Sequence, residues 1–338
     1  MKLATYQDGS RDGQLIVVSR DLTQAHYASH IANRLQQVLD DWNYLSAQLQ
    51  DLSDTLNFGK ARHAFAFDPR QCMAPLPRAY QRLGCAAYPS HLELLQQANT
   101  EAGEAGVQTG LVQLGGDCLA GPHDAIECTD AALGMDFSAG MAVVSADLAM
   151  GSTAEQALDA VRLVMLVNRV LQRGAHGGTE RATAFSPVAL TPDELGVAWA
   201  RGRVHLPLQC TLNARSFGQC DAGADMPLHF GDLLSAACQS RALRAGTILE
   251  CAPVSNTPQQ RKGQAIWPQG FASLAEKRAM EARKDGQSES AYLQPLDCVR
   301  VEMKQADGAS LFGAIELALV APPPPARPSR ASTAAQTA

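Results

Sequence analysis

The segment GMDFSAGMAV, residues 134–143, reads as an apolar strand with polar or small residues at alternate positions. Side chains two residues apart on a strand point to the same face, so carboxylates at such positions can share one metal ion. Hard cations such as Mg²⁺ and Ca²⁺ prefer that pair of oxygens. Asp136, Ser138 and Gly140 share one face of this strand, where Ser138 supplies one weak neutral oxygen, Gly140 supplies no side chain, and Asp136 is expected to support the strand. This face therefore carries no pair of carboxylates at neighbouring positions that could share a divalent cation.

Several motifs follow one another along nearly the whole chain. They are the opening MKLATYQDGSRDGQLIVVSRD, DPRQCMAPLPRAYQ at 68–81, ATAFSPVALTPDELG at 182–196, DAG at 221–223, HFG at 229–231, RAGTIL at 244–249 and SLFGAIE at 310–316. In this order they resemble the bacterial long form of the fumarylacetoacetate hydrolase family. The resemblance bears on the fold more than on activity, because function resides in a site carried by the fold.

The resemblance implies a fold class and a division into domains. We expect an α+β, β-rich fold of the fumarylacetoacetate hydrolase type, a mixed β-sandwich or roll, with a small N-terminal α/β domain. The expected boundaries are 1–74 for the small domain, 75–320 for the hydrolase-like C-terminal domain and 321–338 for a disordered tail rich in Pro and Ala. A chain of 338 residues can bury one large core and a smaller one.

The resemblance also implies where the family holds its divalent metal. Carried over position by position, the four acidic ligands fall on Gly84, Ser138, Gly140 and Arg169. A guanidinium cannot coordinate a cation and repels it. We therefore expect neither a metal nor any other cofactor at this site.

Three residues are the catalytic candidates that the resemblance implies. His91 aligns with the family's general base, and an imidazole suits proton transfer because its unperturbed pKa is about 6.5. Arg173 aligns with an arginine that lies near the substrate in the family, and its guanidinium can donate two hydrogen bonds to a carboxylate or enolate oxygen. Arg169 places a permanent charge where the metal is missing, which can stabilise the same anions. The alternatives are a leftover helix histidine at 91, an ion pair at Arg173, and an Arg169 that pairs with Glu180 or Glu250.

The remaining pocket positions differ from the family at several points. A lysine is replaced by Glu180, a substrate tyrosine by Gln113, and a Gly-Thr pair by residues 252–253. Cys85 and Cys251 map close to the pocket, so a thiolate nucleophile is a further alternative. The full set of predicted substrate-binding residues is Tyr88, Cys85, Gln113, Ser138, Glu180, Glu250 and Cys251.

Periodicity predicts the elements that position these residues. Residues 14–19 predict a strand of a small N-terminal sheet, and apolar residues recur at helical spacing over 31–45. The proline-rich segment 73–77 predicts a hinge. Strand character returns in the second unit at 141–144, 204–208 and 299–303.

Capping signals predict three helices in the second unit. Ser152 followed by Glu155 fits a capping box before the apolar run 157–167. Thr191 precedes a proline and two acidic residues, a typical helix start. A third helix is expected over 231–243, with its end near a glycine.

Composition excludes several classes of function. A net charge of -6 and a pI of about 5.8 indicate no excess of positive charge for binding nucleic acid or an anionic membrane. No apolar run approaches the roughly 20 residues of a spanning helix, and no signal-peptide core follows the N-terminus. The 9 cysteines are scattered without a CxxC pair, as is typical of thiols in a reducing compartment. We expect a cytoplasmic homodimer, as the family implies, that binds a small molecule.

Two functions from different classes remain open, and we favour the first. It is an enzyme without a divalent metal that acts on a small oxo-acid or 1,3-dicarbonyl compound, by C–C cleavage, decarboxylation, enolisation or cyclisation. His91 would move the proton while Arg169 and Arg173 hold the developing oxyanion. The second is a catalytically inactive pseudoenzyme that serves as a binding or partner subunit.

A conventional metal-dependent C–C hydrolase is a minor alternative. It would require other carboxylates to replace the missing ligands. The nearby candidates Glu93, Asp117 and Asp147 do not lie in the strand-paired geometry that a shared cation needs.

The loss of the acidic ligands generates a first prediction. Elemental analysis of the purified protein, before and after chelation, should find no stoichiometric Mg²⁺, Ca²⁺ or Mn²⁺. An ion that is retained at Ser138 and its neighbours would contradict it.

Overall fold

The computed structural model describes residues 1–97, 110–116, 119–128, 133–173 and 179–322. The predicted tail at 321–338 lies outside these residues except for its first two. Within the described residues, no helix combines the length and the apolar character that a membrane span requires.

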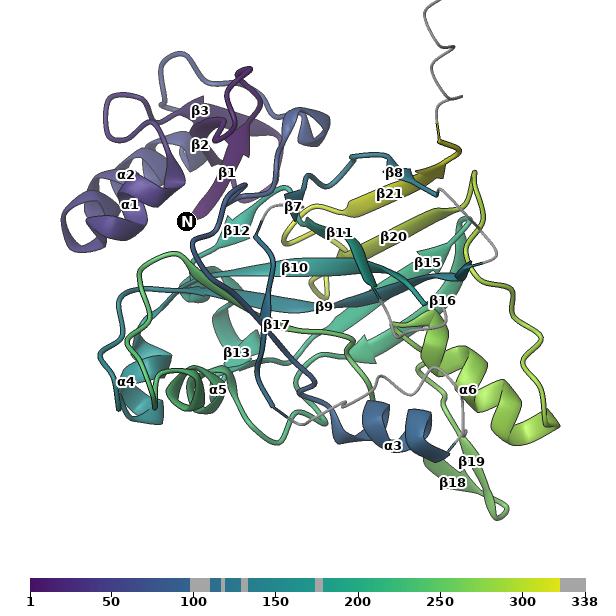
Figure 1. Cartoon of the computed structure of the whole chain (residues 1–338). Coiled ribbons are helices and arrows are strands. Elements are labelled where there is room, and N and C mark those ends of the chain that lie inside the picture. Colours follow the sequence, from purple (N-terminus) through teal and green to yellow (C-terminus); the bar gives the residue numbers. More distant parts are fainter. Residues whose placement is uncertain (98–109, 117–118, 129–132, 174–178, 323–338) are drawn as a thin grey trace, which may run out of the picture.

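A mixed sheet of twelve strands forms the centre of the described structure (Figure 1). Its main path runs β4-β3-β2-β1-β12-β10-β9-β17-β5-β6, while β11 pairs with both β10 and β7. The strands are β1 (Lys2–Tyr6), β2 (Gln14–Val18), β3 (Gln24–Tyr27), β4 (Phe65–Ala66), β5 (Arg82–Cys85), β6 (Val112–Leu114), β7 (Leu119–Ala120), β9 (Met135–Ser145), β10 (Val161–Gln172), β11 (Thr179–Phe185), β12 (Ala189–Leu190) and β17 (Thr247–Cys251).

A second sheet of five strands packs against the first, with the larger apolar core between them. Its order is β16-β15-β20-β21-β8, and two short hairpins, β13-β14 and β18-β19, lie apart from both sheets. These strands are β8 (Ile126–Glu127), β13 (Trp199–Ala200), β14 (Arg203–Val204), β15 (Pro207–Leu212), β16 (Arg215–Asp221), β18 (Gln259–Arg261), β19 (Gln264–Ile266), β20 (Cys298–Met303) and β21 (Ile315–Val320).

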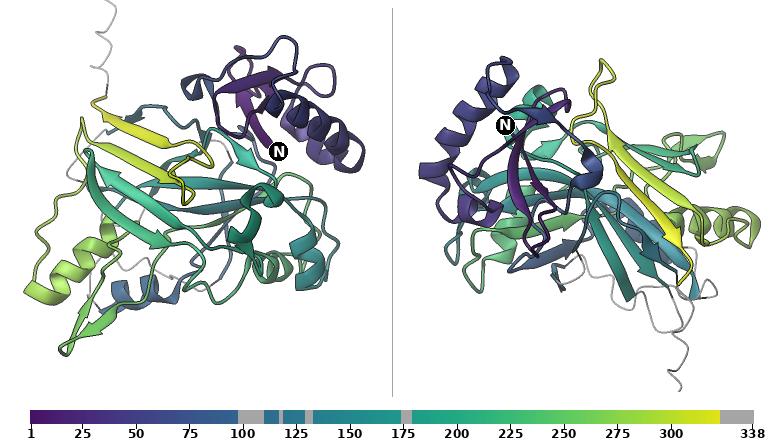
Figure 2. Two further views of the ribbon diagram at one scale, coloured as in Figure 1. Left: turned by 180° about the vertical axis from the view of Figure 1, so that it is seen from behind. Right: turned by 90° about the horizontal axis from the view of Figure 1, so that it is seen from above.

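The helices cover the edges of this layered structure (Figure 2). In the N-terminal unit, α2 packs on β2 and β3 and closes a second apolar core. Further along the chain α4 packs on α5, and α3 packs on α6. The helices are α1 (Leu35–Asp40), α2 (Trp42–Asn57), α3 (Pro89–Gln97), α4 (Ala154–Asp159), α5 (Phe230–Ala237) and α6 (Leu274–Asp285), with 3₁₀ turns η1 (Pro69–Gln71) and η3 (Pro192–Ala198).

The strands predicted at 14–19, 141–144 and 299–303 are confirmed as parts of β2, β9 and β20. The strand predicted at 204–208 is divided between β14 and β15, and the apolar spacing at 31–45 belongs to two helices that meet at Asp41. The third predicted helix, α5, ends at Ala237, earlier than expected.

The helix predicted over 157–167 is wrong. The capping box is formed by Thr153 and Gln156, and α4 ends at Asp159. The apolar run that follows is β10, which pairs with β9 along nearly its whole length and with β11 and β12 on its other side. A run buried on both faces and rich in valine has the composition of a central strand, and here tertiary pairing overrode a genuine helix start signal.

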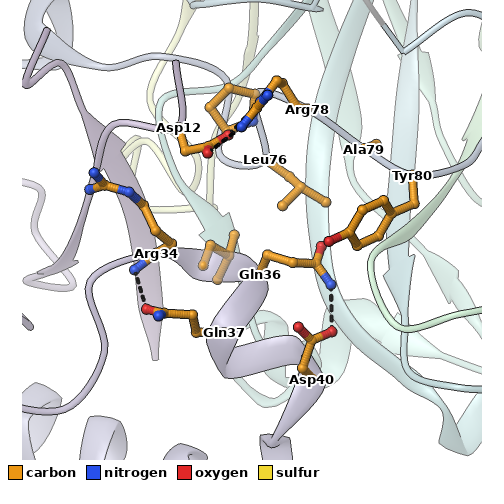
Figure 3. A pocket seen from close by; sticks show the side chains of 11 residues that line it. Asp12, Arg34, Gln36, Gln37, Asp40, Leu76, Arg78, Ala79 and Tyr80 are labelled. Carbon is orange, nitrogen blue, oxygen red and sulfur yellow. Dashed lines mark hydrogen bonds and ion pairs between the residues drawn. The ribbon is translucent and has the colours of Figure 1, made fainter. Parts of the chain in front are cut away.

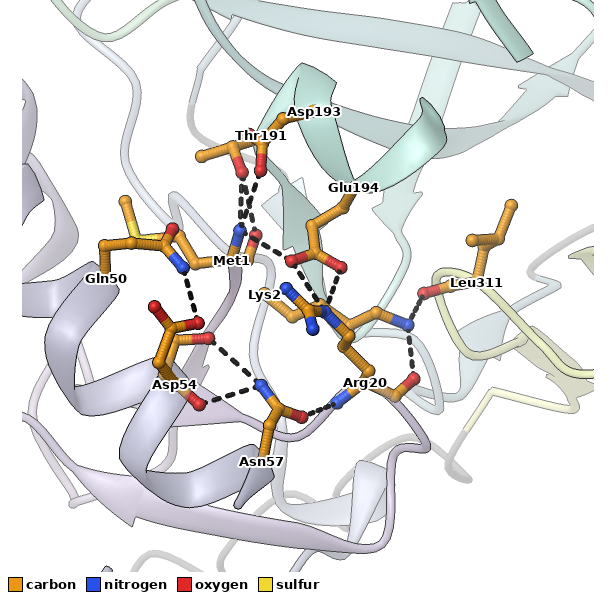
Figure 4. Close-up of polar contacts among 11 residues, drawn as sticks. Met1, Lys2, Arg20, Gln50, Asp54, Asn57, Thr191, Asp193, Glu194 and Leu311 are labelled. Carbon is orange, nitrogen blue, oxygen red and sulfur yellow. Dashed lines mark hydrogen bonds and ion pairs between the residues drawn. The ribbon is translucent and has the colours of Figure 1, made fainter. Parts of the chain in front are cut away.

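The N-terminal unit shares the central sheet with the rest of the chain, because Lys2 of β1 pairs with Leu190 of β12. Polar contacts reinforce this junction (Figure 4). Arg20 Nε lies 3.2 Å from a carboxylate oxygen of Glu194, and Lys2 Nζ donates to the carbonyl oxygens of Arg20 at 2.8 Å and Leu311 at 2.6 Å. Burial lowers the pKa of Lys2 to about 8, although Glu194 opposes the shift.

One buried side chain in β10 lacks partners. Asn168 is fully buried, and neither its amide nitrogen nor its amide oxygen has a hydrogen-bond partner among the described residues. An unsatisfied buried polar group costs about 1–3 kcal/mol. We predict that Asn168→Val raises the free energy of unfolding by about 1–2 kcal/mol, measured by chemical denaturation.

The control for this prediction is Asn168→Asp, which places a charge at the same position and should lower stability. A valine variant less stable than the parent would mean that a buried water or ligand satisfies the amide.

Candidate functional site

A guanidinium lies at the centre of the region where the family's metal was expected. The side chain of Arg82, in β5, is fully buried and uses all five of its N–H donors. Two go to the carboxylate of Glu250 and one to Glu180 at 2.5 Å. The others go to Thr183 Oγ1 at 2.6 Å and to the carbonyl oxygen of Gly115 at 2.8 Å. This cation therefore joins β5, β11 and β17.

The two carboxylates around Arg82 respond differently to burial. Burial raises the pKa of Glu250, and the hydrogen bonds from Arg82 offset this only in part. Burial also acts on Glu180, but hydrogen bonds from Arg82 and Thr183 outweigh it, and the pKa of Glu180 lies below its ordinary value. The ladder between β10 and β11 shifts register next to Glu180, a bulge that allows this side chain to reach Thr183 at 2.8 Å.

Arg169 extends the same network towards solvent. Its Nε lies 3.7 Å from Glu180 Oε2, and its side chain is 20% exposed. The Nε atom is itself buried and has no hydrogen-bond partner among the described residues. The sequence left open that Arg169 pairs with Glu180, and the two side chains are indeed neighbours. At 3.7 Å this contact is too long for a hydrogen bond, so it does not use the Nε donor of Arg169.

A side chain at either of two expected ligand positions would meet neighbouring atoms. A Cβ atom at Gly140 would lie 2.1 Å from the carbonyl oxygen of Cys251 and 2.7 Å from the Cβ of Ala252. A Cβ atom at Gly84 would lie 2.8 Å from the side chain of Leu114. Backbone at the end of β17 therefore leaves no space for a side chain at Gly140, whereas at Gly84 the neighbour is a leucine side chain of β6 that can move.

The residues at these positions do not fit a divalent cation. Arg169 of β10 is the register partner of Ser138 of β9. A positive charge therefore adjoins the Ser138 hydroxyl, the one side-chain oxygen at the expected ligand positions. Among the described residues, no three side chains of His, Cys, Asp or Glu are grouped so that they could hold a metal ion. Hard cations require several oxygen ligands, which this arrangement does not supply.

Asp136 connects β9 to α6 and to Arg173. Its Oδ1 accepts hydrogen bonds from the backbone N–H groups of Leu274 at 3.0 Å and Ala275 at 3.2 Å, at the start of α6. Its Oδ2 accepts from Arg173 Nη2 at 2.5 Å and Nε at 3.0 Å. Arg173 therefore forms an ion pair with a carboxylate, as one of the alternatives foresaw, and Asp136 caps a helix that is distant in sequence.

His91 forms a buried pair with Glu276. The imidazole Nδ1 lies 3.0 Å from Glu276 Oε1, and the two residues are 4% and 0% exposed. A neutral imidazole that donates from Nδ1 to this carboxylate carries its lone pair on Nε2. Glu276 Oε2 is buried without a partner among the described residues, and so is the hydroxyl of Ser273.

Backbone pairing joins this pair to Arg169. Ser138 of β9 bridges to Ser273, three residues before Glu276, and the N–H of Ala139 donates to Ala272. On the neighbouring strand β10, Arg169 is the register partner of Ser138. The orphaned polar atoms of Arg169, Ser273 and Glu276 thus lie on segments that adjoin one strand. Such orphans in a native protein are explained by strain, by a catalytic role or by a bound water or ion.

The other predicted pocket residues are less directly placed. Cys85 and Cys251 are register partners on β5 and β17 and are both buried. Tyr88 is buried and donates from its hydroxyl to the carbonyl oxygen of Ala222 at 2.7 Å. Gln113 is exposed on β6, whose next residue, Leu114, packs against Gly84.

Two important residues were not predicted from the sequence. Arg82 stands two residues before Gly84 on the same strand, so strand alternation could have placed its side chain on the face of the expected ligands. Glu276 follows Ser273 in the spacing of a capping box, which would assign it to a solvent-exposed helix start. Its carboxylate turns inward to His91, and Asp136 caps α6 in its place.

Comparison with known families and structures agrees with this architecture. The model of the fumarylacetoacetase N-terminal domain 2 matches residues 1–78, and that of the fumarylacetoacetate hydrolase C-terminal domain matches residues 84–317. No curated protein sequence matches the chain.

Solved structures share the fold over nearly their full length. Maleylpyruvate hydrolase from Sphingobium sp. SYK-6 has a TM-score of 0.64 at 14% identity, covering 95% of this chain and 100% of that chain. Fumarylacetoacetate hydrolase from Exiguobacterium antarcticum has 0.63 at 17%, covering 95% and 100%. A probable 2-hydroxyhepta-2,4-diene-1,7-dioate isomerase from Mycobacterium abscessus has 0.63 at 16%, covering 96% and 100%.

The Sphingobium enzyme is also known in complex with manganese(II) and pyruvate, in a structure similar to this chain at a TM-score of 0.63 and 14% identity, covering 95% and 99%. At such identities the likeness shows the fold, and the expected fold class is confirmed. Since the C-terminal family model covers more than half of the chain, the protein belongs to the fumarylacetoacetate hydrolase family.

Proposed function

We propose that this protein acts on a small oxo-acid or 1,3-dicarbonyl compound without a divalent metal. The observation that carries the proposal is the buried His91–Glu276 pair, which backbone pairing joins through Ser138 to the partly exposed cation of Arg169. A base and a cation are the two groups that enolisation, decarboxylation or C–C cleavage next to a carbonyl requires.

Each residue has a distinct part in this proposal. His91 Nε2 takes or gives the proton, and Glu276 fixes the tautomer that leaves this nitrogen free. Arg169 binds the carboxylate or the developing enolate oxygen through donors that its long contact with Glu180 leaves available. Arg173 acts as a positioning residue, because its bonds to Asp136 hold the start of the helix that carries Glu276.

The substrate class rests on the family and on one relative. The Sphingobium maleylpyruvate hydrolase binds pyruvate, an oxo-acid, together with manganese(II). In the present chain a guanidinium would take over the stabilisation of the anion, but it cannot activate a water molecule as a metal does. Reactions that need only proton transfer and oxyanion stabilisation are therefore favoured over hydrolysis. As the family implies, we also propose a homodimer.

A second candidate function is that of a pseudoenzyme, a binding or partner subunit without turnover. The filled space at Gly140 favours it, because backbone atoms lie where the family would place a ligand side chain. The two candidates differ in whether a bound ligand is converted.

A ligand screen tests the proposal. Among oxo-acids and 1,3-dicarbonyl compounds, at least one should raise the melting temperature, because a ligand that binds only the folded state adds stability. Arg169→Met should abolish this shift, whereas Arg244→Met, which removes an exposed surface arginine, should preserve it. A ligand that stabilises both variants equally would exclude Arg169 from the site.

Conversion of that ligand separates the enzyme from the pseudoenzyme. We predict that His91→Ala lowers kcat by about 10²–10⁴-fold and leaves ligand binding intact, because it removes only the proton transfer. Glu276→Gln should also reduce kcat and alter its pH profile. A ligand that binds to the parent protein but is never converted would support the pseudoenzyme, and unchanged kcat in His91→Ala would remove His91 from the mechanism.

The thiolate alternative generates a separate prediction. Burial raises the pKa of Cys85 to about 11 and that of Cys251 well above its ordinary value of 9.0. Neither thiol ionises at neutral pH, so Cys85→Ala and Cys251→Ala should retain turnover and ligand binding. Loss of kcat in a folded cysteine variant would revive the thiolate mechanism.

The same pKa shifts determine how these thiols affect stability. Above pH 9 the unfolded chain ionises them while the folded protein does not, so their contribution to the free energy of unfolding falls as pH rises from about 9 to 11. Chemical denaturation across this range should show a smaller decline in the two alanine variants.

A further inference from the structure

A hollow of about 590 Å³ lies between the β18-β19 hairpin and α6, apart from the site described above. Figure 1 shows the hairpin and this helix side by side at one end of the molecule. The residues that line the hollow are Gly263, Gln264, Ala265, Ile266, Trp267, Phe271, Met280, Arg283 and Lys284, which we call the α6 cup. Its volume falls within the range of about 300–1,000 Å³ that is usual for small-molecule sites.

The wall of the α6 cup is apolar and partly aromatic. The rings of Trp267 and Phe271 lie 5.9 Å apart at an interplanar angle of 37°. Phe271 belongs to a small apolar cluster between α3 and α6, against which Trp267 and Met280 pack while remaining partly exposed. Partly exposed aromatic and thioether groups that line a concavity are typical of ligand sites, because an apolar occupant removes them from water.

The rim of the cup carries positive charge. Arg283 and Lys284 form the last turn of α6, and both side chains are exposed. Lys262, in the turn of the hairpin, is a third cation of the rim and precedes the lining residue Gly263. The acidic residues nearest this turn are Asp285 and Glu281, whose carboxylate accepts hydrogen bonds from the backbone and hydroxyl of Ser290, and neither of them lines the cup.

Another hollow of the same protein shows the contrast (Figure 3). It lies beside α1, and the polar groups on its walls largely pair with one another. Arg78 Nη2 lies 2.5 Å from Asp12, and Gln36 donates to Asp40 at 2.7 Å. The charges that line that hollow are therefore largely paired within it, whereas the α6 cup combines an apolar wall with cations at its rim.

We propose that the α6 cup binds a monocarboxylate with an apolar body, such as a medium-chain fatty acid. The apolar body would lie against Trp267, Phe271 and Met280, which leave water on binding. The carboxylate would remain at the rim, where the ammonium of Lys284 donates to it and Arg283 adds positive potential. The ligand differs from the small polar oxo-acid of the proposed function, and the two sites share no residue.

Octanoate is the probe for this proposal. Calorimetric titration into the full chain should show saturable binding to one site, together with a change in tryptophan fluorescence. This change should be absent in Trp267→Phe, because the other two tryptophans of the chain lie outside the cup. Acetate, which has the charge without the apolar body, and octanol, which has the body without the charge, should each bind at least tenfold more weakly.

Charge reversal at the rim provides matched variants. Lys284→Glu should weaken octanoate binding at least tenfold. Lys277→Glu changes the same charge on the same helix, but this amine lies over the ring of Phe217, 5.3 Å from its centroid, and outside the cup, so affinity should remain unchanged. Absence of saturable binding to the parent protein, or equal affinity in the two glutamate variants, would refute the proposal.

Discussion

The buried guanidinium of Arg82 is the interaction on which the arrangement of the site depends. All five of its donors are used, and its partners come from β11, β17 and the segment after β6. A buried cation is tolerated only when it is fully paired. Glu250 and Glu180 therefore both position the Arg82 side chain and compensate its buried charge. The consequence is a region where buried protein charges balance one another. Arg169, at the edge of this network, has an Nε without a hydrogen-bond partner among the described residues.

A second constraint comes from Asp136, which links the sheet to the helix that supports the base. By capping α6 with one oxygen and binding Arg173 with the other, it performs the role that Ser273 and Glu276 would have in a local capping box. Glu276 is thereby released from the helix terminus and turns to His91. The orientation of the proposed base therefore rests on a carboxylate from a strand that is far away in sequence.

Much of the architecture could be predicted from the sequence because it rests on local patterns and on many ordered motifs. The strands at β2, β9 and β20 follow from apolar composition, and the resemblance led to the correct family. The helix predicted over 157–167 failed because a capping signal is local, whereas an apolar run between two long strands gains more by pairing with both. A start signal determined where α4 begins and could not determine where it ends.

The sequence alone determined that Gly84, Gly140 and Arg169 bring no ligating side chain to the expected metal positions. It could not determine what occupies the space instead. Leu114 beside Gly84, the chain at 251–252 beside Gly140, and the pairing of Arg82 with two glutamates all arise from contacts between distant segments. The same holds for the His91–Glu276 pair, whose members are 185 residues apart. Residue types fix which chemistry is available, and only the packing of strands and helices decides which of those groups meet.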